Sequence, residues 1–275
     1  MTGNIYLDLT NEFNDGALRA ILSSGQAIVV HGLAFASKDG DWIVRETPES
    51  LDHILRVLAL HGARYRMGAP LDARWMRGGW SAHFEFNHNG ERIRCDFVSR
   101  PPRVSAEDLS EMWREHEEGR GLEEPVPTID VRRLAELKKT DRERDYPFIA
   151  ELAPKMALHD QILQSRSALD LMELAKEHRA EVVRLAEERS LLRLLLEQVP
   201  DRRAIRLALS EEQIDLMDKD AARLADYARA ATQWQKIWPE LRKQARHLPL
   251  IQAHQLVVQH AQSLLPEQPD GTRIS

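Results

Sequence analysis

Short apolar runs separated by turn residues fill the first half of the chain. The runs cover residues 26–30, 42–44, 63–66, 81–86 and 92–98. Their length and their content of β-branched and aromatic residues are typical of strands, and the glycines at several of their ends are typical of turns. The pattern therefore predicts five strands between residues 25 and 103.

A helical pattern interrupts these strands after residue 46. Thr47 is a suitable N-cap, Pro48 suits the first helical position, and Glu49 gives an acidic first turn. Apolar residues follow at helical spacing: Leu51, Ile54, Leu55 and Leu58. We expect this helix to end at Gly62 and a further helix to begin at Ser105. The order of two strands, one helix and three strands indicates a mixed α/β or α+β domain rather than a βαβ repeat.

The second half of the chain has a different pattern. After about Val126 the strand-like alternation disappears, and apolar residues recur three and four positions apart, which predicts helices. Pro200 ends one apolar stripe, and Ser210 with Gln213 forms a capping box that opens the next helix. The expected helices are 128–152, one or two within 169–199, one from 210 that is interrupted at Pro239, and 250–264.

These elements predict an α+β fold, in which a mixed sheet flanked by helices is followed by an all-α bundle. We expect a first domain over residues 1–152, a helical domain over 153–265 and a frayed tail over 266–275. Charged residues alternate with the apolar stripe, but strict heptads are not sustained. This favours an antiparallel bundle with solvated outer faces over a coiled-coil dimer.

Composition excludes several classes of protein. The 275 residues are 43% hydrophobic and 30% charged, which is typical of a soluble globular chain. No run approaches the roughly 18 apolar residues of a membrane span, and residues 1–15 lack the order of a signal peptide, so we expect a cytoplasmic protein with no membrane partner. The single cysteine, Cys95, excludes an intrachain disulfide and a four-cysteine zinc site. A net charge of −6 argues against a dedicated nucleic-acid coat.

Three aspartates in the first half are the strongest candidates for chemistry. Asp39 and Asp41 are two residues apart, so on a strand they project from the same face. Asp96 shares one face of the 92–98 strand with Arg94, while Cys95 lies on the other face. If the two strands are neighbours, three carboxylates converge. Converging carboxylates suit magnesium ions, which prefer oxygen ligands and promote attack by a hydroxyl on a triphosphate.

These segments resemble the nucleotidyltransferase (polymerase β-like) superfamily, in the form of a bacterial minimal-nucleotidyltransferase-like domain with a helical C-terminal extension. The resemblance lies in an apolar strand that ends in glycine at 28–32, an acid-x-acid pair that leads a second strand at 39–45, and the helix that begins at Thr47. Asp96 resembles the third acidic residue, on a later strand. Residues 134–149 are similar to a helix in which a lysine and a basic-acidic pair lie near the nucleotide phosphates. The resemblance covers residues 25 to 152.

The resemblance implies a nucleotidyltransferase that moves a nucleotidyl group, most often adenylyl, from a nucleoside triphosphate such as ATP to a hydroxyl of an RNA, protein or small-molecule acceptor. It implies that Asp39, Asp41 and Asp96 hold Mg²⁺ and that Asp96 also activates the acceptor hydroxyl. The expected nucleotide-binding residues are Gly32, Arg94, Lys138 and Arg142. Arginine suits this task because its planar fork matches phosphate oxygens.

The chain departs from the family pattern in three places. Leu33 follows Gly32 where the family has a second small residue that approaches the phosphates. The gap from Gly32 to Asp39 is shorter than usual, and Gly40 replaces an apolar residue between the two acids. These departures favour an alternative: a binding or interaction module that keeps the fold without the chemistry. Membership of a toxin–antitoxin or phage-defence pair is a further alternative, since such systems use this fold.

Simpler interpretations of the same residues also remain open. Asp39-Gly40 between strand-like runs is a favoured two-residue hairpin turn. Lys138 and Arg142 lie among acidic residues and are compatible with a solvated, salt-bridged helix face. His83 is expected to be a hydrogen-bonded strand histidine rather than a catalytic base, and Cys95 to be part of the core.

Overall fold

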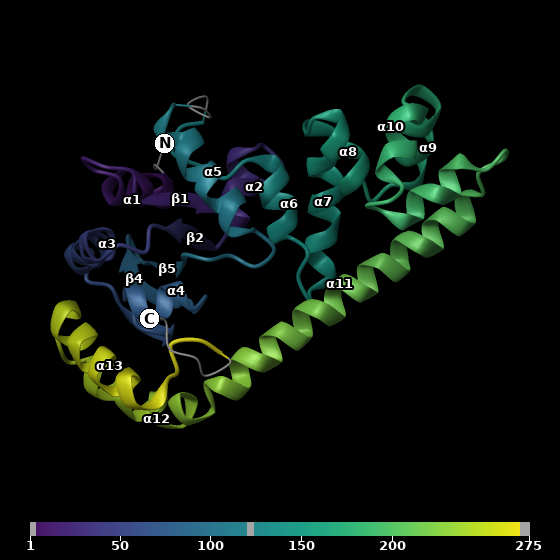
Figure 1. The fold of residues 1–275 in the computed structure, drawn as a ribbon. Helices are drawn as coiled ribbons and strands as arrows, with labels where there is room; N and C mark the ends of the chain where they lie inside the picture. Colours follow the sequence, from purple (N-terminus) through teal and green to yellow (C-terminus); the bar gives the residue numbers. More distant parts are fainter. Residues whose placement is uncertain (1–3, 120–123, 270–275) are drawn as a thin grey trace. The chain divides into compact units, whose positions relative to one another are not determined.

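A computed structural model describes residues 4–119 and 124–269, and its chain forms two compact units (Figure 1). The first, which we name the sheet unit, comprises Met1–Ile129 and Ala225–Ser275. The second, the helical unit, comprises Asp130–Leu224. The sheet unit is therefore built from both ends of the chain.

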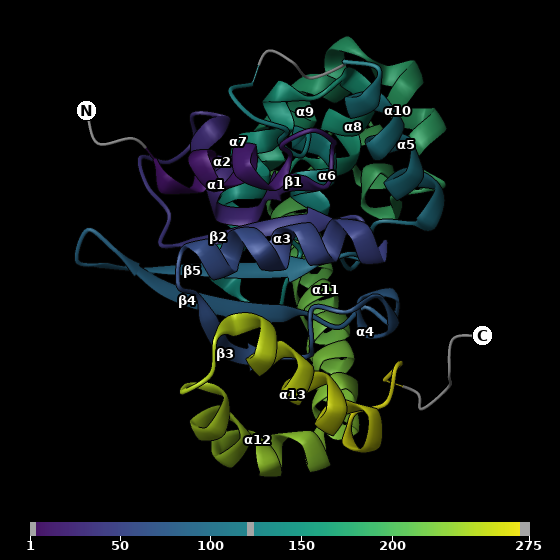
Figure 2. The same ribbon diagram turned by 90° about the vertical axis from the view of Figure 1, so that its left-hand side faces the viewer.

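A five-stranded mixed sheet organises the sheet unit. Its strands are β1 (Ala20–Ser23), β2 (Asp39–Val44), β3 (Arg64–Gly68), β4 (Ala82–His88) and β5 (Glu91–Val98). Their order across the sheet is β1-β2-β5-β4-β3, and only β2 and β5 run parallel. The β4–β5 hairpin projects at one end of the sheet, as Figure 2 shows. Strands far apart in sequence, β2 and β5, thus lie side by side at its centre.

The two faces of the sheet differ in chemistry. Along β4 and β5 buried apolar residues alternate with half-exposed polar ones, as a strand with one face in the core requires. The apolar face carries an aromatic cluster in which Phe97 stacks on Trp42 and meets Phe84 edge-on. Helices cover this face, and Figure 2 shows α3 and α13 lying over it. The opposite, polar face bears the candidate site.

The helices of the sheet unit begin where the sequence supplies caps. Thr47 accepts a hydrogen bond from the Ser50 amide at the start of α3, and Ser105 accepts one from the Asp108 amide at the start of α5. The helices are α1 (Ile5–Phe13), α2 (Ser24–Val30), α3 (Pro48–Leu60), α4 (Ala73–Arg77), α5 (Ala106–Glu117), α12 (Thr232–Ala245) and α13 (Leu250–Leu264). Val257 and Ala261 of α13 are fully buried in the core of this unit.

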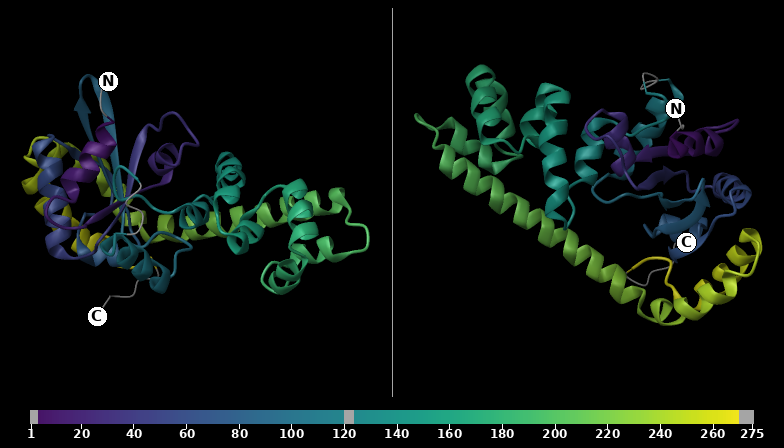
Figure 3. Two further views of the ribbon diagram at one scale, coloured as in Figure 1. Left: turned by 90° about the horizontal axis from the view of Figure 1, so that it is seen from above. Right: turned by 180° about the vertical axis from the view of Figure 1, so that it is seen from behind.

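The helical unit has its own core of leucine, isoleucine and valine side chains. Its α-helices are α6 (Val131–Leu137), α7 (Tyr146–Leu152), α8 (Leu158–Gln164), α9 (Ala168–Glu177) and α10 (Arg179–Leu185). Its 3₁₀ helices are η1 (Glu143–Asp145), η2 (Ala153–Lys155) and η3 (Ser190–Leu196). The long helix α11 (Arg202–Ala230) starts here and carries the chain back to the sheet unit, as the two views of Figure 3 make clear.

The α+β class predicted from sequence is confirmed, with a mixed sheet, flanking helices and a helical second half. Four of the five predicted strands correspond to β2, β3, β4 and β5, and the helix at 250–264 is α13. The two compact units differ from the domains expected from sequence, which meet at residue 152. Helices α12 and α13 pack with the sheet and therefore belong to the sheet unit. None of the helices in the described ranges has both the length and the apolar character of a membrane span.

Three predicted elements are wrong. Residues 26–30 form helix α2 instead of a strand, because a short apolar run fits a buried helix as well as a strand. The edge of the sheet next to β2 is formed by β1 instead. The expected helix 128–152 is broken into α6, η1 and α7. Ser210 is not an N-cap: it lies inside α11, where its hydroxyl donates to the Arg206 carbonyl. Helix α12 continues through Pro239.

Candidate functional site

The parallel pairing of β2 with β5 brings the three predicted aspartates to one face of the sheet. Asp41 is the direct partner of Asp96, and Asp39 is the direct partner of Arg94. Alternation along β2 places Asp39 and Asp41 on the same face. The hairpin interpretation of Asp39-Gly40 is wrong, since both residues belong to β2. The site is therefore a row of acidic side chains across two adjacent strands.

Gly40 between the two acids has a packing explanation. A Cβ atom built at this position would lie 2.4 Å from the Trp42 ring and 2.5 Å from the Tyr6 ring. Both rings are buried, and the Tyr6 hydroxyl donates to the Lys38 carbonyl at 2.6 Å. Two aromatic side chains thus take the space that a larger residue at position 40 would need. The departure at Gly40 is compensated within the core and leaves the acid-x-acid geometry in place.

Asp96 is paired with two side chains of the sheet. Arg66 donates to both of its oxygens, at 2.7 and 2.9 Å, and His83 Nδ1 lies 2.9 Å from Oδ1. The other ring nitrogen of His83 lies 2.7 Å from the Ser81 hydroxyl. Burial alone would raise the pKa of Asp96, but its hydrogen bonds and charge interactions with His83 and Arg66 outweigh burial and lower this pKa. Asp96 is an ionised carboxylate whose orientation is fixed from two sides.

Asp39 lies at the more open end of the acidic row. Its side chain is 40% exposed and forms an ion pair with Arg94 at 3.2 Å. Arg94, expected to bind nucleotide, is 37% exposed, so its guanidinium is accessible to a ligand. Asp96, by contrast, is only 19% exposed. The row therefore runs from a half-buried carboxylate with a fixed orientation, Asp96, to the more accessible ion pair of Asp39 with Arg94.

The turn that precedes α2 differs from the one expected near Gly32. Gly32 follows the C-terminal end of α2, with φ of +74°. The strand-to-helix turn lies earlier, where Ser24 has φ of +50° and a Cβ on Gly25 would lie 2.3 Å from the Ser37 hydroxyl. Gln26 donates to the Ser37 carbonyl at 2.9 Å. The small residues that pack against the segment before Asp39 are thus at the start of α2, and Gly32 is at its other end.

Lys138 and Arg142, also expected to bind nucleotide, belong to the helical unit. They gather around one buried acid, Asp145, at 3.7 Å from Lys138 Nζ and 2.8 Å from the Arg142 guanidinium. The hydroxyl of Thr140 donates to the same carboxylate at 2.8 Å. Lys138 is itself buried, with its ammonium 5.6 Å from the centre of the Phe148 ring. Arg142 is half exposed and is the more accessible of the two cations.

The carboxylates of the site suit a magnesium ion that is also bound by substrate phosphates. Among the residues that the structure describes, no three His, Cys, Asp or Glu side chains are close enough together to hold a metal ion, so the three aspartates share a face but do not converge as the sequence predicted. Magnesium, however, is commonly held by one or two carboxylates together with substrate phosphates rather than by an all-protein cage. Asp41 and Asp96, paired across adjacent strands, supply such carboxylates, and each carboxylate oxygen has two lone pairs. The residues present fit a metal ion that arrives with a phosphate ligand.

Arg66, Ser81 and His83 were not identified as site residues by their sequence pattern. Arg66 lies on the edge strand β3, and its contact with Asp96 depends on β3, β4 and β5 being neighbours in that order. The expectation that His83 is a hydrogen-bonded strand histidine is confirmed, but its partner is the candidate acid Asp96. The alternation Ser81-x-His83 on a strand was the available signal, since it places both side chains on one face.

Comparison with known proteins gives limited information. No family model matches the chain, and no curated protein matches it. Two solved structures from Helicobacter pylori are similar: a protein described as a candidate nucleotidyltransferase, at 12% identity, and JHP933, at 13% identity. The first covers 78% of this chain and 94% of its own, the second 80% and 92%, and both have a TM-score of 0.35. At this similarity the argument about function depends on the site itself.

Proposed function

We propose that the protein transfers a nucleotidyl group from a nucleoside triphosphate to a hydroxyl acceptor. The observation that supports this most is the register of the parallel pair β2–β5, which places Asp41 directly opposite Asp96 with Asp39 on the same face. Carboxylates in this arrangement are the groups that nucleotidyl transfer needs, because the reaction requires hard oxygen ligands and a base next to the attacking hydroxyl. The sequence resemblance to the nucleotidyltransferase superfamily points to the same chemistry.

In this proposal Asp39, Asp41 and Asp96 would hold Mg²⁺ with the triphosphate. Bound magnesium would supply charge neutralisation for the phosphates during transfer. Asp96 would accept the proton of the acceptor hydroxyl, and His83 and Arg66 would keep its carboxylate oriented, since they bind it at 2.9 and 2.7 Å. Arg94 would donate to phosphate oxygens, with Gly32 as a further nucleotide contact proposed from the resemblance.

The nucleotide is proposed to be ATP, with adenylyl transfer as the reaction, because this is the commonest activity in the family that the sequence resembles. The acceptor is proposed to be an RNA or a protein. The active groups sit on strands of one sheet rather than on separate loops, so substitution of a single carboxylate by its amide should remove activity while it preserves the fold.

Incubation of the full chain with α-labelled ATP, magnesium and an extract that supplies RNA and protein acceptors tests this proposal. We expect label to enter an acceptor with the wild-type chain and to fall by about 100-fold or more with Asp41→Asn or Asp96→Asn, as for loss of an essential general base. Asp8→Asn is the matched control, because Asp8 is exposed on α1 and its substitution removes the same charge. Wild-type levels of labelling by both site variants, each shown by circular dichroism to be folded at the assay temperature, would reject the mechanism.

A second candidate function is a binding module that keeps the fold without the chemistry. The observation in its favour is that side chains of this chain already lie against the acids: Asp39 pairs with Arg94, and Asp96 pairs with Arg66 and His83. Such pairing stabilises an acidic row without a metal. On this interpretation the wild-type chain would transfer no label under any acceptor condition. Any labelling that depends on Asp41 would exclude it.

A further inference from the structure

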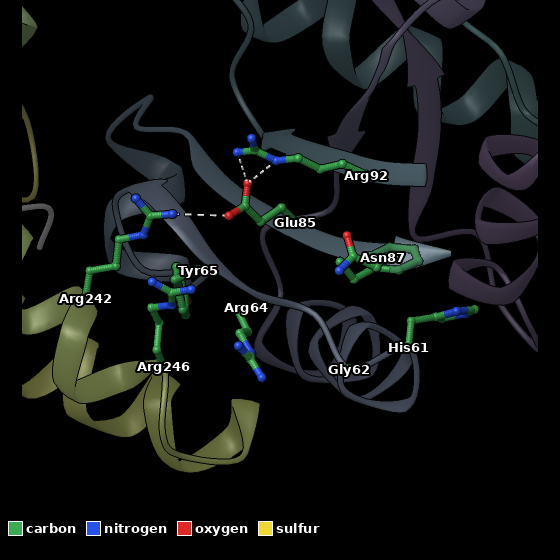
Figure 4. A pocket seen from close by; sticks show the side chains of 10 residues that line it. His61, Gly62, Arg64, Tyr65, Glu85, Asn87, Arg92, Arg242 and Arg246 are labelled. Atoms are coloured by element: carbon green, nitrogen blue, oxygen red, sulfur yellow. Dashed lines mark hydrogen bonds and ion pairs between the residues drawn. The ribbon is translucent and has the colours of Figure 1, made fainter. Parts of the chain in front are cut away.

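A basic cavity opens at the edge of the same sheet, away from the acidic row. Its volume is about 520 Å³. Figure 4 shows its lining side chains, which come from the end of α3, from β3, β4 and β5, and from α12. Four of the lining residues are arginines: Arg64, Arg92, Arg242 and Arg246. We name this cavity the arginine pocket.

The charges of the arginine pocket are only partly neutralised. Glu85 is the one acid of its lining, and it accepts from Arg92 at 2.8 Å and from Arg242 at 3.1 Å. The guanidinium groups of Arg64 and Arg246 have no hydrogen-bond or ion-pair partner within residues 4–119 and 124–269, and both side chains are exposed. The Nε of Arg242 is also buried without a hydrogen-bond partner among the described residues. The pocket thus holds an excess of positive charge and unused donors.

The pocket is aligned with the acidic row through the register of the sheet. Across four strands, Asp39 pairs with Arg94, Arg94 with Glu85, and Glu85 with Arg64. The next row along the strands joins Asp41, Asp96 and His83. Rows two residues apart are separated by roughly 6–7 Å along a strand. A ligand that crosses the polar face from Asp96 toward Glu85 therefore enters the arginine pocket.

We propose that the arginine pocket binds phosphate groups. Arginine matches phosphate oxygens through paired, parallel donors. Because the guanidinium groups of Arg64 and Arg246 have no internal partners, they can bind phosphate without the free-energy cost of breaking an ion pair. Arg242 and Arg246, four apart at the end of α12, face the same side of the helix and point two guanidiniums toward the strands, as Figure 4 shows. If the proposed transfer reaction is correct, these phosphates belong to the acceptor, as the backbone of an RNA or as a small phosphate ester.

Binding of a fluorescein-labelled ten-nucleotide RNA to the full chain, followed by anisotropy at several salt concentrations, tests the proposal. We expect Arg64→Gln with Arg246→Gln to weaken binding roughly tenfold or more, since two charge-assisted hydrogen bonds are lost. Each phosphate contact with a single strand contributes about 0.7 to the slope of log K against log salt, where K is the association constant. Loss of two contacts should therefore reduce the magnitude of this slope by about 1.4. Competition by inorganic pyrophosphate is the second arm, because it supplies phosphate without a nucleic acid.

The matched control is Arg56→Gln with Lys236→Gln, which removes the same charge from exposed residues of α3 and α12 outside the pocket lining. Displacement of RNA by pyrophosphate assigns the pocket to small phosphate compounds, and RNA binding that pyrophosphate does not displace assigns it to a nucleic-acid backbone; both support the proposal. Equal weakening by the two double variants, or no binding of either probe to the folded chain, would overturn it. Because this readout uses no catalysis, RNA binding can be measured whether or not the chain transfers a nucleotide, so the two proposals can fail separately.

Discussion

Asp96 shows how neighbours decide the protonation state of a half-buried carboxylate. Its burial opposes ionisation, yet Arg66 and His83 lie within hydrogen-bond distance and lower its pKa. The ionised form is what both metal binding and acceptance of a proton require. Residue type and strand alternation indicated that Asp96 faces away from Cys95, and Cys95 is indeed fully buried. The two partners of Asp96 were not predictable, because they come from strands whose order the sequence does not state.

The pairing of Asp96 predicts a pH dependence of stability. A carboxyl with a lowered pKa in the folded state stabilises the fold above its unfolded pKa, near 3.9, and this contribution is lost as pH falls through the folded value. We therefore expect Asp96→Asn to reduce the free energy of unfolding by about 1–3 kcal/mol at neutral pH. The difference from wild type should shrink as the pH falls below 4, measured by urea denaturation at each pH. A difference that grows on acidification would contradict the assigned ion pairs.

At the scale of elements, alternation was a good guide for strands and a poor one for short apolar runs. β4 and β5 alternate cleanly because one face of the sheet is apolar and the other polar. The run at 26–30 lacks such alternation, and there tertiary position decided for helix α2. Cap residues were also informative, since Thr47 and Ser105 do accept the expected hydrogen bonds. Ser210 has the same local pattern but lies within a longer helix, where its hydroxyl bonds to the backbone four residues earlier.

Gly40 gives a prediction about strand β2. Gly40→Ala places a methyl group against the buried rings of Tyr6 and Trp42, which have no free direction in which to move. Overpacking of this kind is expected to cost about 1–3 kcal/mol of unfolding free energy. A displacement of strand β2 by the added methyl group should also lower transfer activity, because Gly40 lies between Asp39 and Asp41. Urea denaturation of the variant provides the measurement, and stability equal to wild type would show that these rings do not fill the space above β2.

At the scale of the whole molecule, the two ends of the chain build one unit around the sheet. The sequence indicated a helical second half but not that its last two helices complete the core of the first. Trp234, Leu241 and Val257 are buried together with residues of the strands. Long-range pairing of this kind leaves no periodic signal in a single sequence. The same return of the chain supplies Arg242 and Arg246 to the arginine pocket.

Val257 tests this arrangement of the chain. All six tryptophans lie in the sheet unit, so tryptophan fluorescence follows the unfolding of that unit. Val257→Ala should reduce its unfolding free energy by about 1–3 kcal/mol, from lost burial and the remaining cavity. Val183→Ala is the control, because Val183 is 52% exposed in the helical unit. If the two variants have the same fluorescence midpoint, α13 is not part of the core of the sheet unit.

The central claim is that the acidic row on β2 and β5 holds a nucleoside triphosphate together with magnesium. Calorimetric titration of ATP into the full chain, with Mg²⁺ or with EDTA, measures this most directly. The account predicts binding that requires Mg²⁺, that weakens about tenfold or more in Asp41→Asn and Asp96→Asn through loss of a charged ligand, and that is unchanged in Asp8→Asn. ATP binding that is equal with EDTA and in both site variants, or absent from the folded wild-type chain, would contradict it.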